Sequence, residues 1–151
     1  MIKLPSPRPL SVKILAFAFL VGTVFAVISI LDYTHFLVLT LTGLSARLIN
    51  IGWSLLSAYA TFGLWHVHKL ARRIAIGMFL YLIVNNGLLI FRATTEGWAA
   101  AGAAELGYEL PRSWLATYWT FLCFGVFLPV IGIWLLFRTK PAFATSPTLP
   151  T

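Results

Sequence analysis

The chain has 151 residues, of which 60% are hydrophobic and only 10% are charged, whereas soluble domains average about 45–50% apolar and about 25% charged residues. This composition excludes an ordinary water-soluble surface, and the length allows four membrane spans of roughly 20 residues each. The net charge of +7 does not indicate nucleic-acid binding, because the basic residues lie scattered at the ends of apolar runs and form no dense patch.

The first apolar run follows a basic stretch and resembles a signal peptide. Residues 14–31 are longer than the usual apolar region of about 7–15 residues in such peptides, and no small-x-small cleavage site follows them. We therefore expect a membrane span that is retained in the protein.

Four stretches without charged residues predict four membrane-spanning helices. Each has about 18 residues or more, enough for a helix to cross a hydrocarbon core of roughly 30 Å. Backbone groups in lipid must bond internally, and these runs are too long for barrel strands, so each should be helical. The fold class is therefore an all-α membrane protein with one four-helix antiparallel bundle over residues 1–140, and its spans are residues 14–31, 48–65, 74–91 and 113–137.

The basic residues predict the orientation of this bundle. If the N-terminus is cytoplasmic, only Arg47, Arg92 and Arg112 of the eleven Lys and Arg residues fall on the outer side, which satisfies the positive-inside rule. Both termini are then cytoplasmic. The inner turn at residues 66–73 is short enough to force spans two and three into an antiparallel hairpin, and the Pro- and Thr-rich tail 141–151 should be disordered unless a partner holds it.

Two outer connections, residues 32–47 and 92–112, are longer. In the first, the apolar piece from Phe36 to Leu41 is too short to cross the bilayer, and we expect it to lie in the interface or to extend the first helix. The second contains alanine and glutamate suited to a short amphipathic helix ahead of Pro111.

Adjacent asparagines, Asn85 and Asn86, interrupt the third apolar run. In lipid, small residues and polar side chains join helices. The second span carries Ser54 and Ser57 on one face, with Asn50 and Thr61 completing the stripe at helical spacing. The first span offers the small residues Ala18, Gly22 and Ala26 at intervals of four.

Matching depths across the hairpin gives Asn85 a partner. If Trp65 and Ile74 are level at the inner surface, Asn85 is level with Ser54, and we expect a hydrogen bond between them. Asn86 points about 100° away, toward a different neighbour. The favoured interpretation is a helix-packing polar cluster of Asn85, Asn86, Ser54 and Ser57; the alternative is that the asparagines line a ligand, ion or quinone pocket.

Histidine offers the other candidate chemistry. His66 and His68 are two residues apart, so on a helix they point to different sides and do not form the i, i+4 pair that binds metal. His66 could serve as a single axial ligand to a haem or a chlorophyll-type pigment, but an interfacial anchor is the simpler interpretation. His35, at the outer surface, is a weaker candidate. No metal site is predicted.

Catalysis is not supported by the sequence. No span has a carboxylate, Lys, Arg or His at mid-depth that could relay protons. Cys123 and the serines of span two have no intramembrane histidine to activate them. We therefore expect a protein that is not an enzyme.

Two segments resemble a known pattern. The stretches GLWHVHKLARRIAIGMFLYL and WLLFRTKPAF are similar to those of small uncharacterised bacterial four-span integral membrane proteins, in which a second span ends in Gly-Leu and a basic turn with Ala-Arg opens the third. The resemblance implies a bacterial inner-membrane location, and it implies no activity and no functional residue.

The sequence thus predicts a multi-pass, non-catalytic accessory or scaffold subunit of a larger membrane complex, whose partners are the lipid bilayer and other membrane subunits and which binds no cofactor. One alternative is a subunit that binds a pigment, haem or quinone in electron transfer or light harvesting, with His66 or His68 as ligand. A second alternative is a small-solute channel or transporter with a water-accessible path past Asn85.

Overall fold

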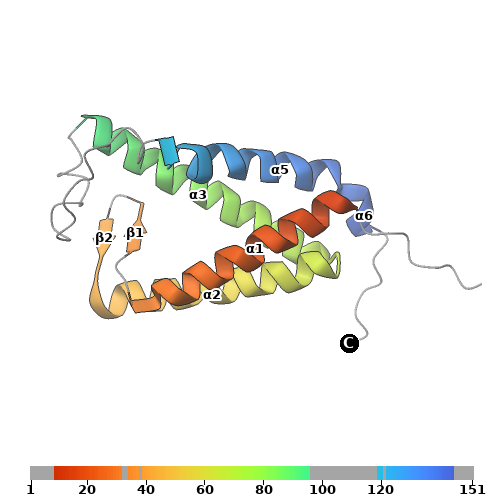
Figure 1. Ribbon diagram of the computed structural model, residues 1–151, viewed down its shortest axis with the longest axis horizontal. Helices are drawn as coiled ribbons and strands as arrows, with labels where there is room; N and C mark the ends of the chain where they lie inside the picture. Colours follow the sequence, from red (N-terminus) through yellow and green to blue (C-terminus); the bar gives the residue numbers. More distant parts are fainter. Residues whose placement is uncertain (1–8, 32–33, 38, 96–118, 121, 145–151) are drawn as a thin grey trace, which may run out of the picture.

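The computed structural model describes residues 9–31, 34–37, 39–95, 119–120 and 122–144 (Figure 1). These residues are helical, as predicted, except for one small β-hairpin. The long helices are α1 (Leu10–Ile28), α2 (Gly43–Trp65), α3 (Lys69–Thr95) and α5 (Leu128–Arg138). The short elements are the 3-10 helix η1 (Ser29–Leu31), strands β1 (Thr34–Phe36) and β2 (Leu39–Leu41), the π-helical segment η4 (Cys123–Phe127) and helix α6 (Lys140–Ala144).

Consecutive long helices run in opposite directions along the long axis of the molecule (Figure 1). Helix α1 packs mainly on α2, α5 packs on α3, and α2 and α3 join the two pairs. The β-hairpin lies at one end of the bundle and α6 lies at the opposite end (Figure 1). Two segments, α1 with η1 and α3, are long and apolar enough to cross a membrane.

Helices α1, α2 and α3 are longer than the charge-free runs that predicted them. Helix α1 begins at Leu10, α2 begins at Gly43, and α3 extends over Lys69–Thr95, whereas the predicted spans begin at residues 14, 48 and 74. Charged side chains do not stop a helix, because Lys and Arg favour helical backbone and keep their charged ends in water while their stems cover apolar surface.

The turn between α2 and α3 is tighter than predicted. Trp65 ends α2, and Val67 adopts a left-handed conformation with φ 59°. The His68 N–H then donates to the Gly63 carbonyl at 2.7 Å, which closes the helix end as a left-handed cap does. The next helix begins at Lys69, so the basic residues predicted to lie in the turn form the first turns of α3.

This tight turn changes the register of the hairpin. A Cβ added at Gly63 would overlap the Cβ of Ala71, and the rings of Trp53 and Tyr81 lie 4.7 Å apart. Asn85 is therefore level with a position near the start of α2 and not with Ser54. The position on α2 that lies level with Asn85 is therefore about five residues, or about 7.5 Å along the helix, from the predicted one.

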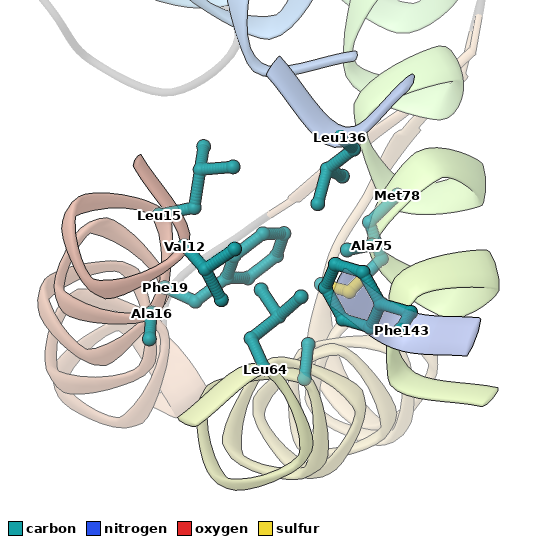
Figure 2. Packing of buried hydrophobic residues seen from close by; sticks show 10 residues of the cluster. Val12, Leu15, Ala16, Phe19, Leu64, Ala75, Met78, Leu136 and Phe143 are labelled. Carbon is teal, nitrogen blue, oxygen red and sulfur yellow. The ribbon is translucent and has the colours of Figure 1, made fainter. Parts of the chain in front are cut away.

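The apolar core lies at the α6 end of the bundle, where five helices contribute side chains that point toward one another (Figure 2). From α1, the buried residues recur at the three- and four-residue spacing of one helical face. The cluster consists of Val12, Leu15, Ala16, Phe19, Ala60, Leu64, Ala75, Met78, Leu136 and Phe143.

Phe143 corrects the expectation of a disordered tail that begins at residue 141. Residues up to Ala144 form α6, and the Phe143 side chain is 2% exposed in the core. An aromatic ring buried in this way orders the segment that carries it, because burial of a Phe side chain contributes about 1.5–3 kcal/mol. The remainder of the tail, residues 145–151, lies outside the described residues.

The piece from Phe36 to Leu41 also differs from the prediction, because it does not extend the first helix. It forms an antiparallel hairpin in which Thr34 pairs with Leu41 and Phe36 pairs with Leu39. The segment contains Thr, Phe and Val, which are residue types enriched in strands. The expectation that this piece lies in the membrane interface stays a prediction.

The last long helix contains an irregularity that the sequence analysis did not predict. Cys123–Phe127 form a π-helical segment immediately before α5, and Pro129 is buried near the start of α5. Proline lacks the N–H that would bond the carbonyl four residues earlier, and a wider turn accommodates that loss. Residues 113–118 and 121 of the predicted span 113–137, and the predicted amphipathic helix before Pro111, lie outside the described residues.

Candidate functional site

Asn85 is buried at the hairpin end of the bundle and binds the hairpin turn. Its Oδ1 accepts a hydrogen bond from the backbone N–H of Leu37 at 2.6 Å and a longer one from the Tyr81 hydroxyl at 3.4 Å. The predicted bond to Ser54 is not made, because the Ser54 hydroxyl donates to the Asn50 carbonyl of its own helix at 2.7 Å. The register shift described above explains this difference.

Aromatic rings surround this contact. The Tyr81 ring lies 4.7 Å from the ring of Trp53 on α2 and 5.7 Å from the ring of Phe36 on β1. Aromatic pairs at such distances contribute about 0.5–1.5 kcal/mol each beyond their buried area. The hairpin is therefore held by an apolar contact and by one amide side chain that meets its turn.

Ser57 joins α1 to α2. Its hydroxyl donates to the Phe19 carbonyl at 3.1 Å and lies 2.9 Å from the Thr23 hydroxyl, which itself donates to Phe19 O at 2.8 Å. Gly22 belongs to the predicted small-residue stripe, and a Cβ there would meet the Ser57 hydroxyl at 3.8 Å. Nearer the hairpin, the Asn50 amide donates to the Ser29 carbonyl at 2.8 Å.

Asn86 makes its bond within α3, where its Nδ2 donates to the Leu82 carbonyl at 2.8 Å. Its side chain packs against η4, because a Cβ added at Gly125 would lie 2.5 Å from the Asn86 Cγ. Gly132, seven residues later, accommodates the ring of Phe79 in the same way, with 2.6 Å to the nearest ring carbon. Gly125 and Gly132 are seven residues apart, as are Asn86 and Phe79, so each glycine leaves room for one of these α3 side chains.

The predicted polar cluster is therefore buried but not continuous. Asn85, Asn86, Ser54 and Ser57 are all buried, yet each makes its hydrogen bonds with different partners. Sequence reasoning missed the glycines of the last helix and the hairpin turn as partners. The seven-residue spacing of Gly125 and Gly132 could have predicted the glycines as partners. No comparable pattern in the sequence marked the hairpin turn as a partner.

A small cavity lies between α1, α2 and α3. Its volume is about 130 Å³, and it is lined by Ser57 and by apolar and aromatic side chains, including those of Phe19, Trp53 and Phe79. Sites for small molecules and cofactors usually measure about 300–1,000 Å³. The cavity does not include Asn85 or Asn86.

His66 and His68 lie closer together than a continuous helix would allow. The helix ends before them, and their ring centroids are 5.9 Å apart, beside Phe62. The expectation that they point to different sides is therefore wrong. His66 Nδ1 lies 2.9 Å from the Phe62 carbonyl; a carbonyl only accepts, so Nδ1 carries the proton and Nε2 is left with a lone pair when the ring is neutral.

The remaining residues with metal-binding or nucleophilic side chains are dispersed. His35 lies in β1, and Cys123 is a free, exposed thiol in η4. Within the part of the chain that the structure describes, no group of three or more His, Cys, Asp or Glu residues could hold a metal ion.

Comparison of the chain with models of protein families, with curated proteins and with solved structures finds no match. The resemblance of residues 63–82 and 134–143 to small bacterial four-span proteins stays a prediction. The functional interpretation therefore rests on geometry and on physical chemistry.

Proposed function

We propose that this chain is a membrane-embedded, non-catalytic accessory or scaffold subunit of a larger membrane complex. The observation that carries the proposal is the surface of its apolar helices. In the most apolar stretches of α1–η1 and α3, only 17% and 28% of the residues are buried. A helix that is apolar all round must have an apolar environment on every side, and a core helix of a soluble protein would be mostly buried.

The apolar side chains that α1 exposes are large. Phe17 is 63% exposed and Phe25 is 66% exposed, and every turn of α1 carries further exposed apolar side chains. Water-soluble monomers rarely expose contiguous apolar patches larger than about 300–600 Å². In the proposed setting, lipid or neighbouring subunits cover this apolar surface. They also cover the exposed side chains of Phe124 and Phe127 in η4.

The intramembrane polar residues support a structural role. Ser57 bridges α1 and α2, Asn85 fixes the hairpin, and Asn86 fits against a glycine of η4. An interhelical hydrogen bond such as that of Ser57 contributes about 0.6–2 kcal/mol. These side chains have bonding partners inside the protein, so their presence in lipid is explained without a transported or reacting molecule.

The proposed threading has four spans with both termini in the cytoplasm of a bacterial cell. The start of α1, the turn between α2 and α3, and the end of α5 share one end of the bundle (Figure 1). Most of the described cations belong to these segments, and the positive-inside rule assigns such an end to the cytoplasm. The cations of this end are Lys13, Lys69, Arg72, Arg73, Arg138 and Lys140.

Two experiments test this proposal. In a background with Cys123 replaced by Ser, the variants Lys69→Cys and Thr94→Cys place single thiols at opposite ends of α3. A membrane-impermeant maleimide added to intact spheroplasts should label Thr94→Cys and leave Lys69→Cys unlabelled until the cells are lysed. The opposite labelling pattern would invert the threading, and labelling of both would refute the span.

The subunit role is tested by native electrophoresis of the full chain extracted from its own membranes in mild detergent. We expect stoichiometric co-migration with at least one other membrane protein. Paired substitutions then locate the contact: Phe17→Ala with Phe25→Ala removes two rings from the face of α1, and Phe124→Ala with Phe127→Ala removes two from η4. One of these two double variants should lose the partner protein while the other keeps it. Migration of the unaltered chain as a monomer would contradict the proposed subunit role.

An apolar groove beside His66 favours a second candidate function, the binding of a flat hydrophobic cofactor such as a pigment, haem or quinone. The groove measures about 380 Å³ and is lined by side chains of α1 and α2, including Thr23, Phe62 and Trp65. This volume lies within the usual range of ligand sites, and the Phe62 ring is 4.2 Å from that of His66.

Absorbance spectra and quinone extraction of gently purified protein test this candidate. A Soret or chlorin band that disappears in His66→Leu but persists in His68→Leu would support His66 as the ligand. Material without a band and without extractable quinone would exclude the candidate.

A further inference from the structure

Four basic side chains converge on one cavity at the α6 end of the bundle. The cavity has a volume of about 160 Å³ and is lined by Lys69, Arg72 and Arg73 of α3 and by Lys140 and Phe143 of α6. We call it the basic pocket. Lys69, Arg72 and Arg73 are neighbours in sequence, and the fold brings Lys140, 67 residues after Arg73, to the same cavity.

Arg72 is held in a fixed position at this pocket. Its Nε donates to the Leu136 carbonyl at 2.9 Å, and its guanidinium carbon lies 5.4 Å from the centroid of the Phe137 ring. Leu136 belongs to the last turn of α5, whose carbonyls have no partners within the helix. Arg72 therefore uses its Nε–H to close α5, and its terminal nitrogens make no hydrogen bond to the described residues.

The charge around the pocket is not balanced by the described part of the protein. The four acidic residues of the chain, Asp32, Glu96, Glu105 and Glu109, all lie outside the described residues. Four like charges around a shared cavity repel one another, and an anion within the cavity would remove this repulsion. Guanidinium groups bind phosphate oxygens in a bidentate manner, and lysines add point charges.

We propose that the basic pocket binds the phosphodiester headgroup of one anionic phospholipid. The inference rests on the proposed membrane threading, which puts the pocket at the cytoplasmic surface, where anionic lipids and basic residues meet. The cavity of about 160 Å³ is smaller than the usual site for a whole small molecule, so only the phosphodiester group enters it. The Phe143 ring lines one side but is buried in the core, so the glycerol and the acyl chains stay outside the cavity, in the membrane.

Native mass spectrometry of the delipidated full chain tests the inference. Phosphatidylglycerol and phosphatidylcholine are titrated separately, and inorganic phosphate is titrated as a third ligand. We expect one phosphatidylglycerol to bind at least about tenfold more tightly than phosphatidylcholine. Equal binding of the two lipids overturns the proposal, and binding of inorganic phosphate without a preference between the lipids reassigns the pocket to a soluble anion.

A matched pair of double variants separates the pocket from the general positive field. Arg73→Gln with Lys140→Gln removes two exposed charges that line the pocket, and Lys13→Gln with Arg138→Gln removes two exposed charges elsewhere at the same end. We expect the first pair to weaken phosphatidylglycerol binding about tenfold or more and the second to change it less than about threefold. Equal losses in both would mean diffuse attraction and no site.

Alkaline carbonate extraction distinguishes this inference from the proposed function. If the chain stays in the carbonate-washed membrane but shows no lipid preference, only the pocket assignment fails. If it is released as a soluble protein, the membrane function fails, and the lipid inference fails with it.

Discussion

Replacement of Asn85 by Leu should loosen the β-hairpin while the helix bundle stays intact. Leucine has the same number and branching of side-chain heavy atoms but offers no acceptor, so the Leu37 N–H loses its 2.6 Å hydrogen bond. Leu37 is also in the left-handed region with φ 58°, which costs a non-glycine residue roughly 1–2 kcal/mol. Loss of one neutral hydrogen bond lowers local stability by about 0.5–1.5 kcal/mol, which corresponds to about 2- to 12-fold faster opening.

Amide hydrogen exchange of the chain in nanodiscs measures this opening directly. We expect the Leu37 amide and its hairpin neighbours to exchange faster in Asn85→Leu, with little change in the core around Leu64. Asn86→Ala is the matched control, because Asn86 bonds only the Leu82 carbonyl of its own helix. Unchanged exchange at Leu37 in Asn85→Leu, or an equal acceleration in Asn86→Ala, would refute the assigned role of Asn85.

Three further substitutions, one of them with a matched control, test helix packing through thermal unfolding in detergent. Gly63→Ala should destabilise the protein by about 1–3 kcal/mol, because its Cβ would overlap Ala71, whereas Gly52→Ala on the same helix meets nothing within 4 Å and should leave the melting temperature unchanged or raise it. Ser57→Ala should cost about 1 kcal/mol through the lost bond to α1; an unchanged melting temperature would contradict its bridging role. Arg72→Met should cost about 1.5–3 kcal/mol, because it removes a charged donor from the end of α5; a loss below about 0.5 kcal/mol would mean that α5 needs no such closure.

Charge-free runs in the sequence predicted the existence and order of the long helices but not where they begin and end. Lipid selects apolar residues over the thickness of the hydrocarbon core, whereas helix ends are decided by local backbone conformation. Lys69, Arg72 and Arg73 were assigned to a turn because they are charged, yet all three lie in α3. The actual turn depends on Val67 in the left-handed region, and a β-branched residue gives no signal for that conformation.

The four residues of the predicted polar cluster, Asn85, Asn86, Ser54 and Ser57, are buried, but their partners were not predicted. In the proposed membrane setting, burial follows from the cost of leaving an amide or hydroxyl in lipid, which depends only on residue type and depth. Partners depend on register, and the register changed when α3 began at Lys69. Gly125 could have been recognised as a partner of Asn86 from its spacing with Gly132, because glycines at heptad spacing face one neighbour and permit close approach.

The role of Asn85 follows from the backbone geometry of the hairpin. In a two-residue turn between Phe36 and Leu39, the N–H of Leu37 is not part of the strand ladder, so it needs another acceptor wherever water is scarce. In the proposed threading the hairpin lies at the outer membrane surface, where an apolar sequence partly excludes water. An asparagine at this depth on α3 supplies the acceptor, and Tyr81 adds a second donor to the same oxygen. The hairpin leaves this backbone group unpaired, and the Asn85 amide supplies its acceptor; this contact gives the buried polar side chain of α3 a structural role.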